Sequence, residues 1–189
     1  MIASRLGPDV LPMRRNQRSV LAIIVVGLVL TSGGVAGAAQ TSTSVRLTNL
    51  DKALLIQINV VRRAHALRPV KLSTLLSNAA NKHTTDMGQA GYFSHTSLDR
   101  TVFWKRIARS YPTTGHRSWS VGENLLFASP DIGAAEAIGL WMNSPGHRAN
   151  LLDPKWREVG IATRHFDSAA GIYGNQPVSI VTTDFGVRR

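Results

Sequence analysis

The chain has 189 residues, of which 22 are Lys or Arg, 11 are Asp or Glu and none is Cys. This length is typical of one globular domain, and a composition of 43% hydrophobic and 17% charged residues excludes a disordered polyelectrolyte. The absence of Cys excludes disulfides, thiolate metal sites and a cysteine nucleophile. The core must therefore be held by packing alone.

Residues 1–38 have the pattern of a secretory signal peptide. Three arginines within residues 14–18 precede an uninterrupted apolar run over residues 20–30, and small residues follow at 36–39 as an A-x-A-like cleavage site. The apolar run is shorter than the ~20 residues of a membrane-spanning helix. We expect cleavage near Ala38 and a secreted or cell-envelope protein, with retention as a weak membrane anchor as the alternative.

The charge of the chain is retained after such processing. Residues 39–189 hold 18 basic and 10 acidic side chains, a net charge of +8. In an exported protein, a basic surface suits anionic cell-wall polymers or lipid headgroups. Nucleic acid is not expected as a partner, because the basic residues are scattered and form no recognised binding motif. Ordinary solvated charge is the alternative explanation.

The first two predicted helices follow a short Ser/Thr linker at residues 39–47. Residues 48–51, Thr-Asn-Leu-Asp, have the spacing of a capping box with Asp in place of Glu or Gln. An apolar stripe then predicts a helix that ends before Pro69. A second helix is predicted over residues 73–90, with Gly91 as its C-terminal stop.

Two shorter helices are predicted further along the chain. Asp99 is expected to cap the first of them, with Phe103 and Ile107 facing inward. Residues 129–131, Ser-Pro-Asp, combine a cap with a proline and predict a helix that runs to about Met142.

Three strands are predicted from segments rich in β-branched and aromatic residues. They are Trp119 to Phe127, Val159 to Phe166, and Val178 to Phe185. Gly and Asn residues between 171 and 176 indicate a hairpin connection between the last two. Because helices come first and strands mostly last, the sequence predicts an α+β fold around an antiparallel sheet, formed as one domain over residues 48–189.

A small set of polar residues stands out as a candidate site. His95 and His147 lie beside the ends of predicted helices, where binding and catalytic residues are commonly placed. Glu123 follows a glycine in an apolar segment, where an unpaired carboxylate would be costly. His65 and His83 are instead expected at helix surfaces or at the edge of the core.

These residues permit three chemical interpretations. Two neutral imidazoles and a carboxylate can hold Zn²⁺ or another divalent metal with an open position for water, whose lowered pKa would supply a nucleophile at neutral pH. Without metal, a histidine could act as a general base oriented by Glu123, contributing ~10²–10⁴-fold. The third interpretation is a buried hydrogen-bond network without turnover.

An ordered set of short motifs runs through the chain. They are Asn59-x-x-Arg62, Pro69-x-x-Leu72, Ala79-Ala80, Asp86-Met87, Phe93-Ser-His95-Thr, Gly122-Glu123-Asn124-Leu125, Trp141-Met-Asn-Ser-Pro-Gly-His147-Arg-Ala-Asn150-Leu, Gly160 and Asp184-Phe185-Gly186. In these residues the sequence resembles the bacterial type of the CAP superfamily, the cysteine-rich secretory, antigen 5 and pathogenesis-related proteins, also called the SCP domain. The resemblance covers residues 50–186.

The resemblance implies an α-β-α three-layer sandwich with a cleft that holds two His and two Glu. Carried over residue by residue, the histidines are His95 and His147 and the first acid is Glu123. The second acid would fall three residues after Trp141, where this chain has Ser144.

Other residues of the implied cleft are weaker candidates. Asn124 and Ser144 belong to the cleft motifs, and Asp184 is a candidate for the missing acid. Glu136 is a poor substitute, because it lies about two helical turns before Ser144. Ile58 replaces a histidine of the family pattern.

Two functions are expected from this sequence, and it leaves open whether the protein is an enzyme. The first is an exported module that binds a lipid, a sterol, an anionic cell-wall polymer or a divalent metal. The second is a metal-dependent peptidase or cell-wall hydrolase that uses His95, Glu123 and His147. A structural or signalling role through a protein partner is a third possibility, which no feature of the sequence favours.

Overall fold

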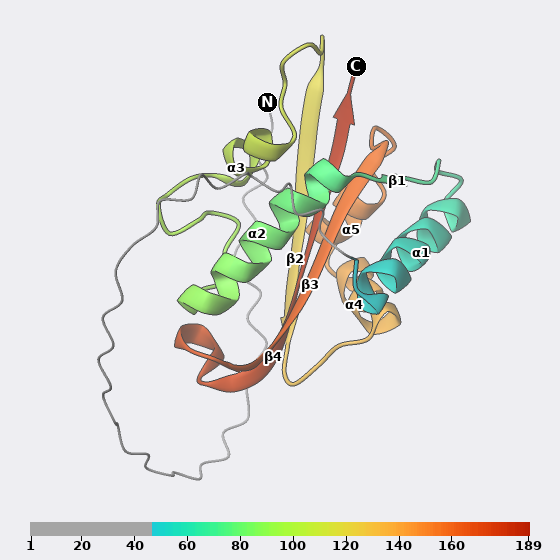
Figure 1. The fold of residues 1–189 in the computed structure, drawn as a ribbon. Helices are drawn as coiled ribbons and strands as arrows, with labels where there is room; N and C mark the ends of the chain where they lie inside the picture. Colours follow the sequence, from blue (N-terminus) through green and yellow to red (C-terminus); the bar gives the residue numbers. More distant parts are fainter. Residues whose placement is uncertain (1–46) are drawn as a thin grey trace, which may run out of the picture. The chain divides into compact units, whose positions relative to one another are not determined.

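The computed structural model describes residues 47–189 (Figure 1). The predicted signal peptide and residues 39–46 of the predicted linker lie outside the described residues. Within residues 47–189, no helix combines the length and the apolar character needed to cross a bilayer.

The helices and strands are interspersed along the chain. The helices are α1 (Asn49–Ala64), α2 (Thr74–Ala90), α3 (Phe103–Ser110), α4 (Ala134–Asn143), α5 (Pro145–Leu151) and the short 3₁₀ helix η1 (Gly171–Tyr173). The strands are β1 (Lys71–Leu72), β2 (Trp119–Ala128), β3 (Glu158–Ala169) and β4 (Gln176–Arg188).

The strands form one sheet in the order β1-β3-β4-β2. Strand β4 pairs antiparallel with β2 on one side and with β3 on the other, which confirms the predicted antiparallel sheet. Strand β1 adds a two-residue parallel pairing to β3 at one edge. This short edge strand was not predicted, because two residues carry no period-2 pattern to detect.

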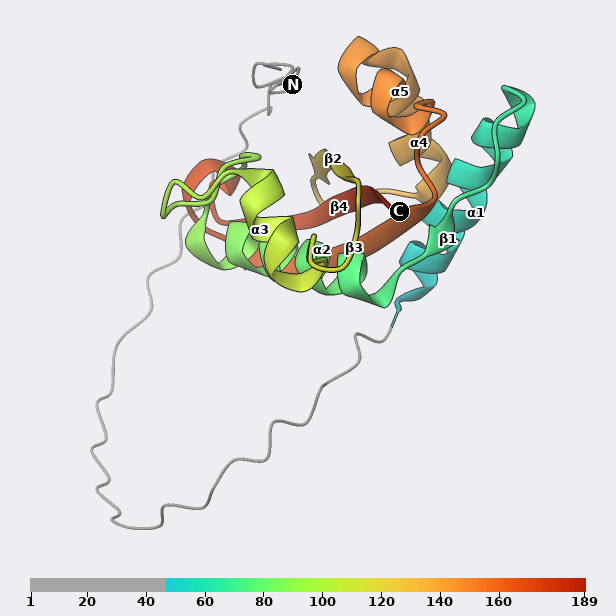
Figure 2. The same ribbon diagram turned by 90° about the horizontal axis from the view of Figure 1, so that it is seen from above.

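Alternate side chains of strand β4 pack against two different layers of helices, one on each face of the sheet. Val178 and Ile180 pack with Met87 of α2, whereas Val181 and Phe185 pack in a second cluster with residues of α1, α4 and α5. Successive residues of a strand point to opposite faces of its sheet. Seen from above, α2 and α3 cover one face, and α1, α4 and α5 lie on the other (Figure 2). The predicted α+β fold is confirmed.

The first two helices begin and end where local chemistry predicts. The Thr48 hydroxyl accepts a hydrogen bond from the Asp51 backbone N–H, and the Asp51 carboxylate accepts one from the Thr48 N–H, completing the capping box of α1. Ser73 caps α2 at its N-terminus. Gly91 ends α2 in the left-handed conformation, with φ of 70°.

The start of α3 differs from the prediction. Its N-cap is Val102, and Asp99 instead accepts a hydrogen bond from the backbone N–H of Thr101 at 2.8 Å. The carboxylate is used within the preceding turn, as Asx turns do, so it is not available to the helix. The predicted inward face is correct for Ile107, which is fully buried.

The start of α4 is also later than predicted. The helix begins at Ala134 with Gly133 as its N-cap, because the side chains expected to cap it bind strand β4 instead. The Ser129 hydroxyl donates to the Pro177 carbonyl, and the Asp131 carboxylate accepts from the Ser179 hydroxyl. Helix α5, with Pro145 in its first turn, was not predicted at all.

One contact between the layers requires a glycine. A Cβ atom at Gly160 of β3 would lie 2.1 Å from the backbone carbonyl carbon of Leu76 and 2.3 Å from the backbone nitrogen of Ser77. The backbone of α2 therefore rests directly on β3 at this point. This close approach fixes the distance between α2 and the face of the sheet that α2 covers.

Candidate functional site

A buried carboxylate, Glu123, is the centre of the candidate site. Strand β2 places it on the face covered by α2 and α3, where its side chain is fully buried. Its Oε1 accepts a hydrogen bond from Nδ1 of His95 at 2.8 Å, and its Oε2 accepts one from Nη2 of Arg106 on α3. Both oxygens are thus occupied by side-chain donors.

The charges around Glu123 keep it ionised. Burial alone would raise the pKa of Glu123, but the hydrogen bond from His95 and the positive charge of Arg106 outweigh burial and hold this pKa below its ordinary value. Because a carboxylate can only accept, the hydrogen of this bond lies on Nδ1 of His95, and in the neutral form of the ring the lone pair is then on Nε2. The His95 side chain remains 35% exposed.

A second buried carboxylate, Asp184, lies opposite Glu123. The two residues are direct partners in the antiparallel pairing of β2 and β4, so their side chains share one face of the sheet. Asp184 is fully buried, and neither of its oxygens has a hydrogen-bond partner among the described residues. Burial, and then the negative charge of Glu123, raise the pKa of Asp184 well above its ordinary value.

His83 adds a buried imidazole beneath this pair. It projects from α2 and is fully buried, deeper than the helix surface or core edge expected from the sequence. Its Nε2 donates to the Ser94 carbonyl at 2.9 Å, which ties α2 to the loop that carries His95. Burial lowers the pKa of His83 to about 4, so the ring is neutral at pH 7.

The remaining predicted residues gather around α5. His147 lies on this helix, and its Nδ1 is 2.9 Å from the Ser144 hydroxyl. Asn124 donates to the backbone carbonyl of His147 at 3.1 Å and accepts from Asn150. A Cβ at Gly122 would lie 2.4 Å from the Asn150 side chain. Residues 122 and 124 therefore face α5, while Glu123 between them faces α2 and α3.

The predicted metal ligands do not fit a three-ligand site in this arrangement. Among residues 47–189, no three His, Cys, Asp or Glu side chains lie where they could hold one metal ion. His95 and Glu123 bind each other, and both carboxylate oxygens of Glu123 already accept hydrogen bonds. Zinc binding by this trio stays a prediction.

Arg106 is a site residue that sequence reasoning missed. It is 5% exposed and lies one residue before the buried Ile107, three residues after Phe103. That spacing places a cation on the inward face of an amphipathic helix, where it needs a buried anion. A charged residue at a core position of the helix was the sequence signal that could have identified Arg106. The sequence alone did not show that Glu123 is the partner of Arg106.

Comparison with known proteins agrees with this fold. Residues 55–173 match the family model described as CAP, the cysteine-rich secretory protein family. The chain belongs to the CAP family. The match spans both the His95 loop and the helix that carries His147.

Two curated relatives of this CAP chain come from Bacillus subtilis (strain 168). One is the uncharacterized protein YkwD, which is 29% identical over 124 residues, covering 64% of this chain and 45% of YkwD. The other is the uncharacterized membrane protein YlbC, which is 31% identical over 115 residues, covering 60% of this chain and 31% of YlbC. The CAP chain thus spans less than half the length of these relatives.

Solved structures of surface and extracellular proteins share the CAP fold seen here. An outer surface protein from Borrelia burgdorferi superposes with a TM-score of 0.58 at 21% identity, covering 73% of this chain and 92% of that protein. An extracellular protein containing an SCP domain from Bacillus anthracis superposes with a TM-score of 0.54 at 26% identity, covering 77% of this chain and 45% of that protein.

Proposed function

We propose that this CAP domain is an exported binding module that attaches to an anionic cell-wall polymer. The supporting observation is a cluster of cations at one end of the sheet, named here the basic rim. It consists of Arg68, Lys71, Arg117, Arg157, Arg188 and Arg189, all exposed or half-buried. The outer-surface and extracellular relatives support export.

Backbone pairing gathers the basic rim from separate segments. The Lys71 backbone N–H donates to the Arg157 carbonyl, joining β1 to the start of β3. The Arg157 backbone N–H donates to the Gly186 carbonyl near the end of β4, and Arg189 exchanges two backbone hydrogen bonds with Ser118. The ends of four strands therefore present their cations together, at the end of the sheet where the label C stands (Figure 1).

Few acids neutralise the basic rim. Asp153 forms an ion pair with Lys155 at 2.9 Å, so the charges of these two residues neutralise each other. Glu158 of β3, which pairs with Lys71 of β1, accepts a hydrogen bond from the Tyr111 hydroxyl. At the opposite end of the sheet, Asp131 and Asp167 both lie against His165. The charge of the domain is thus distributed unevenly along the strands.

A surface of this kind suits a repeating polyanion better than a single ion. Each exposed cation contributes little alone, but several act together on one chain of negative charges. The attraction is screened over ~8 Å at 0.15 M ionic strength, so binding by the basic rim must weaken as salt is raised.

Co-sedimentation with purified anionic wall polymer tests this function. We expect the chain to sediment with the polymer at 0.15 M salt and to be released as salt rises. The triple variant Lys71→Gln/Arg117→Gln/Arg189→Gln should lose most of this binding. Lys52→Gln, an exposed charge on α1 away from the basic rim, should not. Equal binding by both variants would refute the proposal, and stronger binding to anionic vesicles would identify a lipid surface as the partner instead.

A second candidate function, hydrolysis of a peptide or glycan, is favoured by the His95–Glu123 hydrogen bond. Glu123 fixes the ring so that Nε2 can accept a proton, as an oriented general base does. The test is turnover of wall fragments by the chain and by His95→Ala, with His116→Ala as a control at an exposed histidine. Activity that survives His95→Ala would exclude this role.

A further inference from the structure

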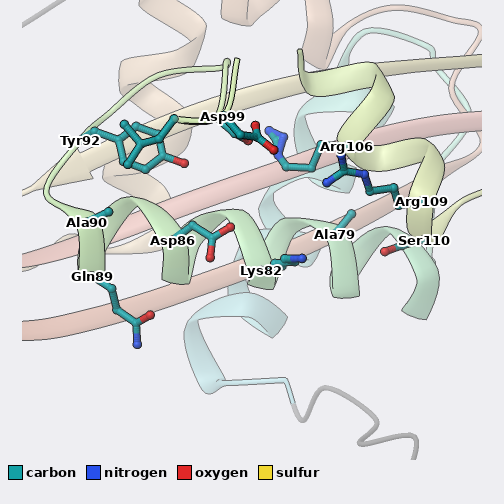
Figure 3. A pocket seen from close by; sticks show the side chains of 12 residues that line it. Ala79, Lys82, Asp86, Gln89, Ala90, Tyr92, Asp99, Arg106, Arg109 and Ser110 are labelled. Carbon is teal, nitrogen blue, oxygen red and sulfur yellow. The ribbon is translucent and has the colours of Figure 1, made fainter. Parts of the chain in front are cut away.

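A cavity between α2 and α3 lies apart from the basic rim and from the His95 ring. Its volume is about 470 Å³, which is within the range of small-molecule sites. Helix α2 contributes Lys82 and Asp86, and α3 contributes Arg106 and Arg109. The loop between the helices closes it with Tyr92, Leu98 and Asp99 (Figure 3).

The cavity lining carries charges of both signs. Lys82 and Arg109 lie toward the part of the cavity that contains Ala79 and Ser110, whereas Asp86 lies nearer to Ala90 (Figure 3). Lys82 and Asp86 are four residues apart on α2, about 6 Å along the helix axis. Asp86 therefore lies at one side of the cavity, and Asp99 shares the other side with Lys82 and Arg109, which leaves that side with a net positive charge.

Two charged groups of the lining, Asp99 and Arg106, interact with other parts of the domain. Asp99 stays ionised, because the hydrogen bond from the Thr101 backbone N–H, with the nearby charges of Arg109 and Lys82, lowers the pKa of Asp99. Arg106 is almost fully buried, and its Nη2 donates a hydrogen bond to Glu123. Its Nε and Nη1 are buried and have no hydrogen-bond partner among the described residues, so Arg106 contributes positive charge to the cavity rather than a hydrogen bond from these two nitrogens.

We propose that this cavity binds a zwitterionic small molecule of amino-acid to dipeptide size. The carboxylate of the ligand is held by Arg109 and Lys82, in the positive field to which Arg106 contributes. Its ammonium group is held by Asp86. Tyr92 and Leu98 supply the apolar surface that covers the body of the ligand. A simple anion would leave Asp86 facing a like charge, and a simple cation would face Lys82 and Arg109.

Calorimetric titration with the dipeptide Ala-Ala at pH 7 tests this proposal. Its N-acetyl form lacks the ammonium group, and its C-terminal amide lacks the carboxylate. We expect Ala-Ala to bind, and each blocked form to bind about tenfold more weakly, because one charged group then has no partner. Binding of inorganic phosphate as tight as that of Ala-Ala would overturn the zwitterion assignment. If Ala-Ala does not bind at concentrations up to about tenfold above ~1 mM, the site itself is overturned.

Substitutions locate each charge of the ligand. Asp86→Asn should weaken binding of Ala-Ala about tenfold and leave the N-acetyl form unaffected. Arg109→Gln should weaken Ala-Ala equally and leave the amide unaffected. Lys105→Gln, an exposed residue of α3 outside the cavity lining, is the matched control and should change neither. Equal losses for free and blocked dipeptides in Asp86→Asn would refute the assigned orientation. Because none of these residues belongs to the basic rim, the outcome is independent of polymer binding.

Discussion

Glu123 of β2 and Asp184 of β4 stand directly opposite each other on one buried face of the sheet. Arg106 and His95 compensate the charge of Glu123, whereas the oxygens of Asp184 have no hydrogen-bond partner among the described residues. Like charges on directly opposed strand positions destabilise a sheet. The pair therefore retains one proton, on Asp184, over the pH range in which an ordinary aspartate is ionised.

Asp184→Asn should remove a pH dependence of stability. Because burial raises the pKa of Asp184 in the folded state, the folded state keeps a proton that the unfolded chain releases above about pH 4. Stability is therefore lost as pH rises from that value toward the raised pKa, by about 1.4 kcal/mol per pH unit. Asn resembles the protonated side chain and does not titrate. Urea unfolding measured at a series of pH values above 4 should show the stability of the variant rising relative to that of the parent as pH increases, and a constant difference between the two would contradict the assignment.

Glu123→Gln should destabilise the fold strongly. The variant leaves the Arg106 guanidinium buried without its carboxylate, and breaking a buried ion pair costs about 3–5 kcal/mol. Urea unfolding at pH 7 measures this loss. Glu136→Gln, an exposed residue of α4, is the control and should stay within about 0.5 kcal/mol of the parent. A loss below about 1 kcal/mol in Glu123→Gln would indicate that Asp184 replaces Glu123 as the partner of Arg106.

His83 should make the fold sensitive to mild acid. Its pKa is about 4 in the folded state and about 6.5 in an unfolded chain, so the unfolded state binds the additional proton between these values. Its contribution is complete above pH 6.5 and is lost as pH falls to 4, roughly 3 kcal/mol in all.

The acid sensitivity of His83 can be isolated by comparing variants. His83→Gln keeps a donor for the Ser94 carbonyl but does not titrate, so its unfolding free energy should fall less between pH 6.5 and 4. His116→Gln, at an exposed position, should follow the parent chain. The assignment is wrong if His83→Gln and the parent lose stability equally over this range.

Gly160→Ala should loosen the contact between α2 and β3. The added methyl would meet the backbone of Leu76 at 2.1 Å, and backbone atoms cannot move aside as a flexible side chain does. We expect a loss of at least about 2 kcal/mol by thermal or urea unfolding. In the control Gly139→Ala, the new methyl meets nothing within 4 Å on an exposed face of α4. That variant should gain about 0.5–1 kcal/mol.

The sequence predicted elements that local chemistry determines. The capping box at Thr48 and the left-handed Gly91 depend on residues within a few positions of each other, and both were found. Asp99 and Ser129 were assigned to helix starts for the same kind of reason, but each binds a different local or cross-strand partner. Where a polar side chain has two available partners, tertiary contacts decide between them.

The site was predictable only in part for a related reason. His95 and Glu123 were named from their motifs, and they do bind each other. The predicted strand implies that Glu123 and Asn124 point to opposite faces, but not which face each of them takes, because that depends on how β2 is set in the sheet. The opposition of Asp184 to Glu123 depends on strand register across about sixty residues of chain, which no local pattern encodes.

Arg106 belongs both to the Glu123–His95 site and to the lining of the α2–α3 cavity, since its guanidinium binds Glu123 and borders that cavity. A ligand whose charge draws on this guanidinium must alter the electric field felt by the Glu123–His95 pair. Thermodynamic reciprocity then requires that protonating Glu123, whose pKa the charge of Arg106 helps to lower, change the affinity of the cavity for that ligand by the same factor by which the ligand changes the proton affinity of Glu123.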